Sequence, residues 1–131
     1  MPTKRCRILL ADDDPVVQCA VGRVVAKSGH ELVSVATGAA LGQAVARWMP
    51  DLVVLDVSFP DADGRDLLAQ LKANPVTKHI PVLVWSARRD RDSESRIALS
   101  LGAEDYLEKS DATMLMGKIA RVLLRLTEAA A

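Results

Sequence analysis

The stretch Ile8-Leu9-Leu10-Ala11-Asp12-Asp13-Asp14-Pro15 decides the fold of this 131-residue chain. Four consecutive apolar residues are typical of a strand that is buried on both faces, as in a parallel sheet covered by helices. Three aspartates follow at once, and a proline after Asp14 is typical of the first turn of a helix. We therefore interpret Asp14 as a helix N-cap. Asp12 and Asp13 stand where the strand ends.

Four further apolar runs have the composition of strands. They cover 32–36, 52–55, 82–85 and, more weakly, 106–107. Segments with helical spacing lie between them, the clearest formed by Leu41, Ala44, Val45 and Trp48 at i, i+3, i+4 and i+7. This fivefold alternation predicts an α/β fold, with a doubly wound parallel sheet, right-handed crossovers and helices on both faces.

Composition narrows the class of protein. Half of the residues are hydrophobic, which suits one domain over residues 1–131, and nothing is left over for an output domain. Lys plus Arg and Asp plus Glu both number 17, so the basic excess of a nucleic-acid binder is missing. No segment approaches the apolar length that spans a membrane. Cys6 and Cys19 form no CxxC and no metal spacing, so we expect reduced thiols and a cytoplasmic protein.

Polar side chains stand at four of the predicted strand ends. Asp12 and Asp13 follow the first strand, Asp56 the third, Ser86 the fourth and Lys109 the fifth. Ligands of such sheets bind at the carboxyl ends of the strands, so we expect these residues to converge there. Clustered carboxylates repel one another unless a cation is present, and all-oxygen ligands suit Mg²⁺. We assign Asp13 and Asp56 as direct ligands and Asp12 as a ligand through water.

The same cluster of residues also predicts a phosphoryl-transfer reaction. An aspartate can act as a nucleophile and form an acyl phosphate, and Asp56 at the end of an apolar strand is the candidate. Lys109 and the Ser86 hydroxyl would stabilise the remaining charge on the phosphoryl group. Taken singly, each of these residues is more simply a turn residue, a structural hydroxyl or a solvated lysine. Their joint placement favours the functional interpretation.

Five motifs in order resemble those of response-regulator receiver domains of two-component signalling. The first is the opening stretch, and the second is Pro50-Asp51-Leu52-Val53-Val54-Leu55-Asp56. The others are Pro60-Asp61-Ala62-Asp63-Gly64, the segment from Ile80-Pro81-Val82 to Ser86-Ala87, and Gly102-Ala103-Glu104-Asp105-Tyr106-Leu107-Glu108-Lys109. The match covers nearly the whole chain, and five ordered motifs are far more specific than one acidic pair.

The resemblance implies a flavodoxin-like fold of five βα units with strand order 2-1-3-4-5. It implies that Asp56 receives a phosphoryl group from a histidine kinase or a histidine phosphotransfer protein. Asp12, Asp13, Asp56 and the backbone carbonyl of Ser58 would hold Mg²⁺. The chain would catalyse its own phosphorylation and dephosphorylation without being a conventional enzyme.

The resemblance also implies a switch. Ser86 would bond the new phosphoryl oxygens and move inward, and Tyr106 would rotate from an outward to an inward position. The face formed by the fourth helix, the fifth strand and the fifth helix would then present the signal to a downstream protein, and it also allows a homodimer. Phosphorylation can act as a signal only if the phosphoryl group favours one of two conformations, so the switch would be a shift in the populations of these conformations.

Two alternatives remain open. Asp12-x-Asp14-x-Val16 also fits the nucleophile motif of haloacid dehalogenase phosphatases, in which Asp12 rather than Asp56 would be phosphorylated. The chain is short for that fold with a cap, and no later acidic pair stands at a strand end. Second, Ser110 follows Lys109 where the family usually has a cis proline, which makes a receiver that binds partners without phosphorylation the other alternative.

Overall fold

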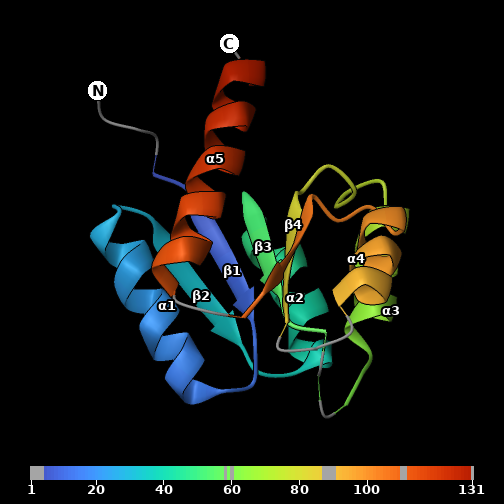
Figure 1. Cartoon of the computed structure of the whole chain (residues 1–131). Helices are drawn as coiled ribbons and strands as arrows, with labels where there is room; N and C mark the ends of the chain where they lie inside the picture. The colour runs from blue at the N-terminus through green and yellow to red at the C-terminus, as the bar shows by residue number, and fades with distance from the viewer. Residues whose placement is uncertain (1–4, 58, 60, 87–90, 110–111, 131) are drawn as a thin grey trace.

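The computed structural model describes residues 5–57, 59, 61–86, 91–109 and 112–130, without the side chains of 91–94 and 127–130. Five strands alternate with five helices (Figure 1). In chain order they are β1 (Arg7–Ala11), α1 (Pro15–Lys27), β2 (Glu31–Val35), α2 (Gly38–Trp48), β3 (Leu52–Leu55), α3 (Gly64–Ala73), β4 (Val82–Ser86), α4 (Arg91–Ser100), β5 (Asp105–Glu108) and α5 (Ala112–Ala130).

All five strands pair in parallel in the order β2-β1-β3-β4-β5. The expected fold class and strand order are therefore confirmed. Helices α1 and α5 cover one face of the sheet, and α2, α3 and α4 cover the other (Figure 1). The reversal of strand order falls between β1 and β3, which is where sheets of this type place their ligands.

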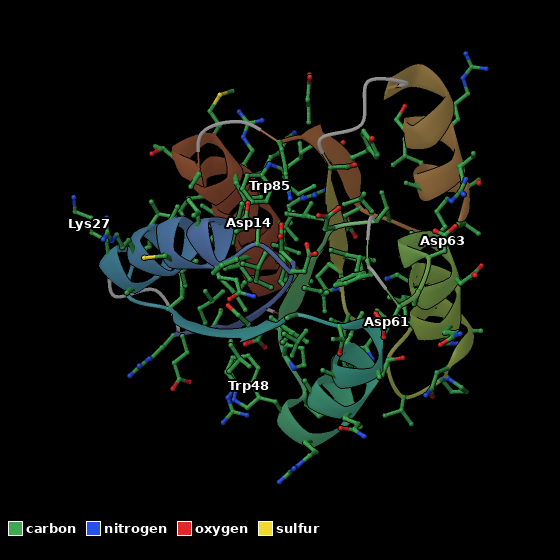
Figure 2. All side chains as sticks on the ribbon, turned by 90° about the horizontal axis from the view of Figure 1, so that it is seen from below. Asp14, Lys27, Trp48, Asp61, Asp63 and Trp85 are labelled. Carbon is green, nitrogen blue, oxygen red and sulfur yellow. The ribbon has the colours of Figure 1, made fainter. Side chains whose placement is uncertain are left out.

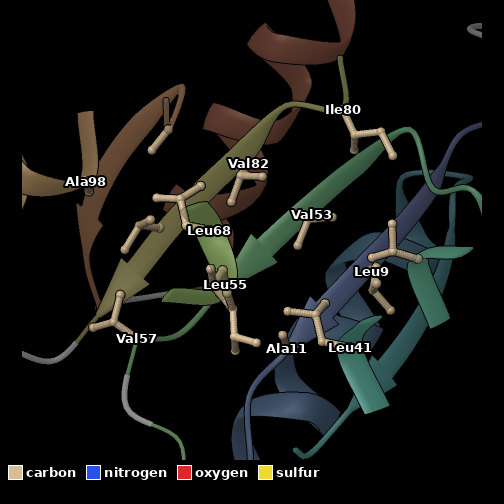
Figure 3. Packing of buried hydrophobic residues seen from close by; sticks show 14 of the residues in the cluster. Leu9, Ala11, Leu41, Val53, Leu55, Val57, Leu68, Ile80, Val82 and Ala98 are labelled. Atoms are coloured by element: carbon tan, nitrogen blue, oxygen red, sulfur yellow. The ribbon is translucent and has the colours of Figure 1, made fainter. Parts of the chain in front are cut away.

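Residues of each central strand divide between two cores because side chains alternate along a strand. Leu9 and Ala11 of β1 pack under α2 and α3, whereas Ile8 and Leu10 pack under α1 and α5. Figure 3 shows the first of these cores, in which Leu41 of α2 and Leu68 of α3 meet Leu9, Val53 and Leu55 of the sheet. Burial on both faces explains the unbroken apolar runs of the sequence.

Helix ends agree with the capping expected from the sequence. Asp14 precedes α1, and its carboxylate accepts a hydrogen bond of 2.9 Å from the backbone amide of Val16, with Pro15 in the first turn. Gly29 and Gly102, which follow α1 and α4, have φ of 83° and 105°, a region that favours glycine. The loop after β3 supplies a cap that the sequence did not reveal: Asp61 accepts from the amides of Gly38 and Ala39 at the start of α2.

The sequence of the last helix has an apolar stripe at helical spacing, which predicts one buried face formed by Leu115, Ile119, Val122 and Leu126. Leu115, Ile119 and Val122 are buried against the sheet as expected, but Leu126, which continues their stripe, is 39% exposed. The C-terminal part of α5 extends past the strands it covers (Figure 1). Met114 and Leu124 are also exposed, whereas Leu123 is buried. Among the described residues, no helix has both the length and the apolar character needed to cross a membrane.

Candidate functional site

The predicted site residues meet at one end of the sheet. In Figure 2 the molecule is seen from the end at which the strands finish, with Asp14 and Trp85 labelled beside this region. The backbone amide of Asp12 donates to Val35 O, that of Asp56 to Ala11 O and that of Lys109 to Ser86 O. The backbone of each residue is thus hydrogen-bonded to a neighbouring strand, so the sheet determines the position of its Cα atom.

Three carboxylates form the centre of the site. Asp12 is fully buried, Asp56 is 6% exposed and Asp13 is exposed to solvent. One oxygen of each lies within 4.8 Å of the others, so the three residues could hold a metal ion. Mg²⁺ needs ligands about 2.0–2.1 Å from the ion, and small side-chain adjustments would bring the oxygens within that range.

Lys109 connects two of these carboxylates. Its Nζ lies 2.7 Å from Asp12 Oδ2 and 2.9 Å from Asp56 Oδ2. Partial burial acts to lower the pKa of Lys109, but the hydrogen bonds and negative charges of Asp12 and Asp56 outweigh it and raise the pKa above its usual value. The lysine is therefore a permanent cation between two acidic groups.

Both carboxylate oxygens of Asp12 have close contacts. Its Oδ1 accepts from the amide of Asp14 at 2.9 Å. Its buried Oδ2 lies 2.7 Å from the ammonium of Lys109. A carboxylate oxygen can accept more than one partner, so Asp12 could contact a metal ion while it stays paired with Lys109. The donor set therefore fits a hard divalent cation such as Mg²⁺.

The two switch candidates, Ser86 and Tyr106, lie on the adjacent strands β4 and β5, two positions apart in the register. Ser86 is fully buried at the end of β4. Tyr106 pairs with Val84 in the β4–β5 register, is 5% exposed and packs in the core under α3 and α4, so it occupies the inward position. Its hydroxyl has no hydrogen-bond partner among the described residues. Ser58, Ala87 and Ser110 lie outside those residues.

Trp85 is a neighbour of the site that the sequence did not reveal. The Nζ of Lys109 lies 5.8 Å from the centroid of its indole ring, within the range of a cation–π interaction. The only signal in the sequence is that Trp85 stands directly before Ser86, and strand alternation alone does not tell which later side chain reaches it.

Comparisons with known proteins agree with this geometry. The family described as response regulator receiver domain matches residues 8–120. The protein-glutamate methylesterase/protein-glutamine glutaminase 2 of Anaeromyxobacter dehalogenans is 40% identical over 119 residues, which are 89% of this chain and 34% of that protein. The response regulator MprA of Mycobacterium leprae is 37% identical over 93% of this chain and 52% of its own length. The chain thus spans about a third to a half of these two relatives.

Solved structures match over more of their length. A putative response regulator from Chloroflexus aurantiacus has a TM-score of 0.85 at 30% identity, covering 92% of this chain and 99% of that one. The Mn²⁺-bound form of response regulator Rcp1 has a TM-score of 0.78 at 30% identity, covering 86% and 90%. With its strand order, the acidic cluster at the strand ends and the family match over residues 8–120, this chain belongs to the response regulator receiver domains of two-component signalling.

Proposed function

We propose that this receiver domain is a phosphoacceptor switch in which Asp56 accepts the phosphoryl group. The observation that carries the proposal is the meeting of three carboxylates and Lys109 at one end of the sheet. The phosphodonor would be a histidine kinase or a histidine phosphotransfer protein, acting in the cytoplasm, where Cys6 and Cys19 would remain free thiols.

In the reaction, a carboxylate oxygen of Asp56 would attack the phosphorus of a phosphohistidine. The P–O bond of an acyl phosphate forms as the P–N bond breaks, and the electron pair of that bond stays on the imidazole nitrogen. Attack of water on the same phosphorus, with release of the Asp56 carboxylate, would return the site to its initial state. The Asp56 carboxylate is the reacting group of the chain in both steps, while the donor protein supplies the phosphohistidine and the solvent supplies the water. The chain would therefore catalyse its own modification without being a conventional enzyme.

Each neighbouring side chain has a role in this proposal. Asp12, Asp13, Asp56 and the backbone carbonyl of Ser58 would hold Mg²⁺, which when bound neutralises charge on the carboxylate and phosphoryl oxygens. Lys109 already contacts Asp56, and it would contact a phosphoryl oxygen on that residue. The Ser86 hydroxyl would donate to another oxygen.

The signal would leave through the face formed by α4, β5 and α5. Tyr106 is the proposed link, since it stands on β5 between the site and that face. A cavity of about 530 Å³ opens along β5 and α5, with Trp85, Met114 and Arg121 in its lining. This face would bind the downstream protein or a second copy of the chain. Sedimentation with and without beryllofluoride would separate these two cases.

Intact mass after incubation with Mg²⁺ and acetyl phosphate tests the proposal. We expect one phosphoryl adduct that requires the metal and is absent in Asp56→Asn. Asp66→Asn, which changes an exposed aspartate in the first turn of α3, is the matched control and should keep the adduct.

Two other results would contradict the assignment in different ways. An adduct that persists in Asp56→Asn and is lost in Asp12→Asn would favour the phosphatase chemistry of Asp12. No adduct on the native chain, together with unchanged spectra in Mg²⁺ and beryllofluoride, would favour a receiver that works without phosphorylation.

A further inference from the structure

The indole of Trp85 provides Lys109 with a contact that carries no charge. Lys109 Nζ lies 5.8 Å from the centroid of the ring, and Trp85 is only 4% exposed. The lysine side chain is itself 19% exposed, so both groups are largely shielded from solvent. Cation–π attraction is strongest for tryptophan and grows when the cation is desolvated.

The position of this ring is fixed by the sheet and by the core behind it. Trp85 pairs with Leu107 in the β4–β5 register, and the amide of Lys109 donates to Ser86 O at 2.7 Å, so the two backbones are tied together beside the ring. The indole packs in the core under α1 and α5, with Leu115 and Ile119. It therefore offers the lysine a rigid surface.

The other contacts of Lys109 are the groups that the proposed reaction changes. Its ammonium pairs with Asp12 and Asp56, which are the proposed metal ligand and phosphoacceptor. When a cation or a phosphoryl group engages these carboxylates, both ion pairs must rearrange. The flexible stem of a lysine does not by itself hold the ammonium in place. The indole, in contrast, takes no part in the chemistry and remains available throughout.

We propose that Trp85 is a positioning residue that acts through Lys109, holding its ammonium at the phosphoacceptor while the carboxylates change partners. This inference rests on the proposed phosphorylation of Asp56. It predicts that the aromatic face, and not only the volume, of residue 85 sets the rate at which the phosphoryl group is gained.

The rate of adduct formation with acetyl phosphate and Mg²⁺ tests this in four proteins: native, Trp85→Leu, Lys109→Met and the double variant. We expect Trp85→Leu to react about tenfold more slowly, which corresponds to about 1.4 kcal/mol in the barrier. In the Lys109→Met background the same change should have no further effect. Trp85→Phe, which keeps an aromatic face, should recover most of the rate.

Ile119→Ala is the control for packing. It removes volume from the same buried cluster without removing an aromatic face. It should lower the thermal midpoint at least as much as Trp85→Leu does and leave the rate unchanged. A native rate in Trp85→Leu, or the same loss with and without Lys109, would overturn the inference, since the tryptophan would then act through packing alone.

Fluorescence tests the contact between Lys109 and Trp85 independently of phosphorylation. Trp48, the other tryptophan, stacks with Arg7, the first residue of β1, and Trp48→Phe leaves Trp85 as the sole indole. In that background, Lys109→Met should change the emission of Trp85, whereas Lys27→Met, in the exposed last turn of α1, should not. Unchanged emission would refute the contact. Failure of the native chain to form an adduct would instead refute the function on which the inference rests.

Discussion

The ammonium of Lys109 lies 2.9 Å from Asp56 Oδ2, although 53 positions separate the two residues in the sequence. The same nitrogen lies 2.7 Å from Asp12 Oδ2. One cation thus offsets part of the repulsion between two carboxylates that are almost fully buried. It stands in the region where a divalent cation would otherwise meet the full negative charge of the cluster.

Lys109→Met should tighten the binding of Mg²⁺. The variant removes a positive charge that repels the metal and leaves Asp12 and Asp56 without the counter-ion that they share. We expect the dissociation constant for Mg²⁺ to fall by about tenfold, or about 1.4 kcal/mol. The increase of the thermal midpoint with Mg²⁺ concentration measures this affinity. Lys118→Met, which breaks a more exposed pair with Asp105, should bind Mg²⁺ like the native chain; equal affinities in all three proteins would contradict the prediction.

Gly64→Ala should destabilise the protein and displace Asp56. A Cβ at Gly64 would lie 2.3 Å from the Cα of Val57 and 2.8 Å from the carbonyl oxygen of Asp56, and neither backbone atom can rotate away. We expect a loss of about 3 kcal/mol in the free energy of unfolding, measured with urea, and a slower phosphorylation rate.

Gly42→Ala provides the comparison. This glycine is exposed within α2, and a Cβ there would meet nothing within 4 Å. The substitution should raise the free energy of unfolding by up to about 1 kcal/mol, because alanine favours the helix. A destabilised Gly42→Ala would show that helix propensity does not govern this site.

Asp61→Asn should reduce stability at neutral pH but not in acid. The hydrogen bond from the amide of Gly38, together with that from Ala39, outweighs the opposing effect of desolvation and lowers the pKa of Asp61 below its usual value of 3.8. A carboxylate whose pKa is lower in the folded state than in the unfolded state stabilises the protein fully at pH values above its pKa in the unfolded state. This stabilisation is lost as the pH falls through the pKa of the folded state. The thermal midpoints of the native and variant proteins should therefore differ at pH 7 and converge below pH 3.8.

Thr37→Ala is the matched control for this pH dependence. Thr37 caps the same helix through an uncharged oxygen, which accepts from the amide of Ala40 at 3.1 Å. Its loss should cost about 1 kcal/mol at every pH. If the cost of Asp61→Asn were equally independent of pH, ionisation of Asp61 would not contribute to the cap.

Tyr106→Phe should stabilise the protein. The buried hydroxyl of Tyr106 has no hydrogen-bond partner among the described residues, and an unsatisfied buried group costs about 1–3 kcal/mol. We expect the free energy of unfolding to rise by about 1 kcal/mol. Thr77→Val removes a hydroxyl that donates to Leu71 O at 2.7 Å and should lower it by about the same amount. A destabilised Tyr106→Phe would mean that this hydroxyl has a partner after all.

Most of the fold could be predicted from local patterns. The predicted strand 52–55 coincides with β3, and the other four strands differ from their predictions by one residue at one or both ends. Leu41 and Val45 of the predicted helix face are buried as expected. The exposure of Leu126 could not be predicted, since periodicity along α5 continues beyond the point at which the sheet ends.

By itself the sequence determined that Asp12, Asp56, Ser86 and Lys109 stand at the ends of strands, because the spacing of apolar residues reports secondary structure locally. Only the tertiary structure decided that one lysine bridges two aspartates, that Asp61 caps a helix from a distant loop and that Trp85 lies beside Lys109. These contacts depend on strand order and register, which bring together residues as far apart in the sequence as Ala39 and Asp61, at 22 positions, and Asp12 and Lys109, at 97 positions. Such distances are set by how whole layers pack, and no local pattern records them.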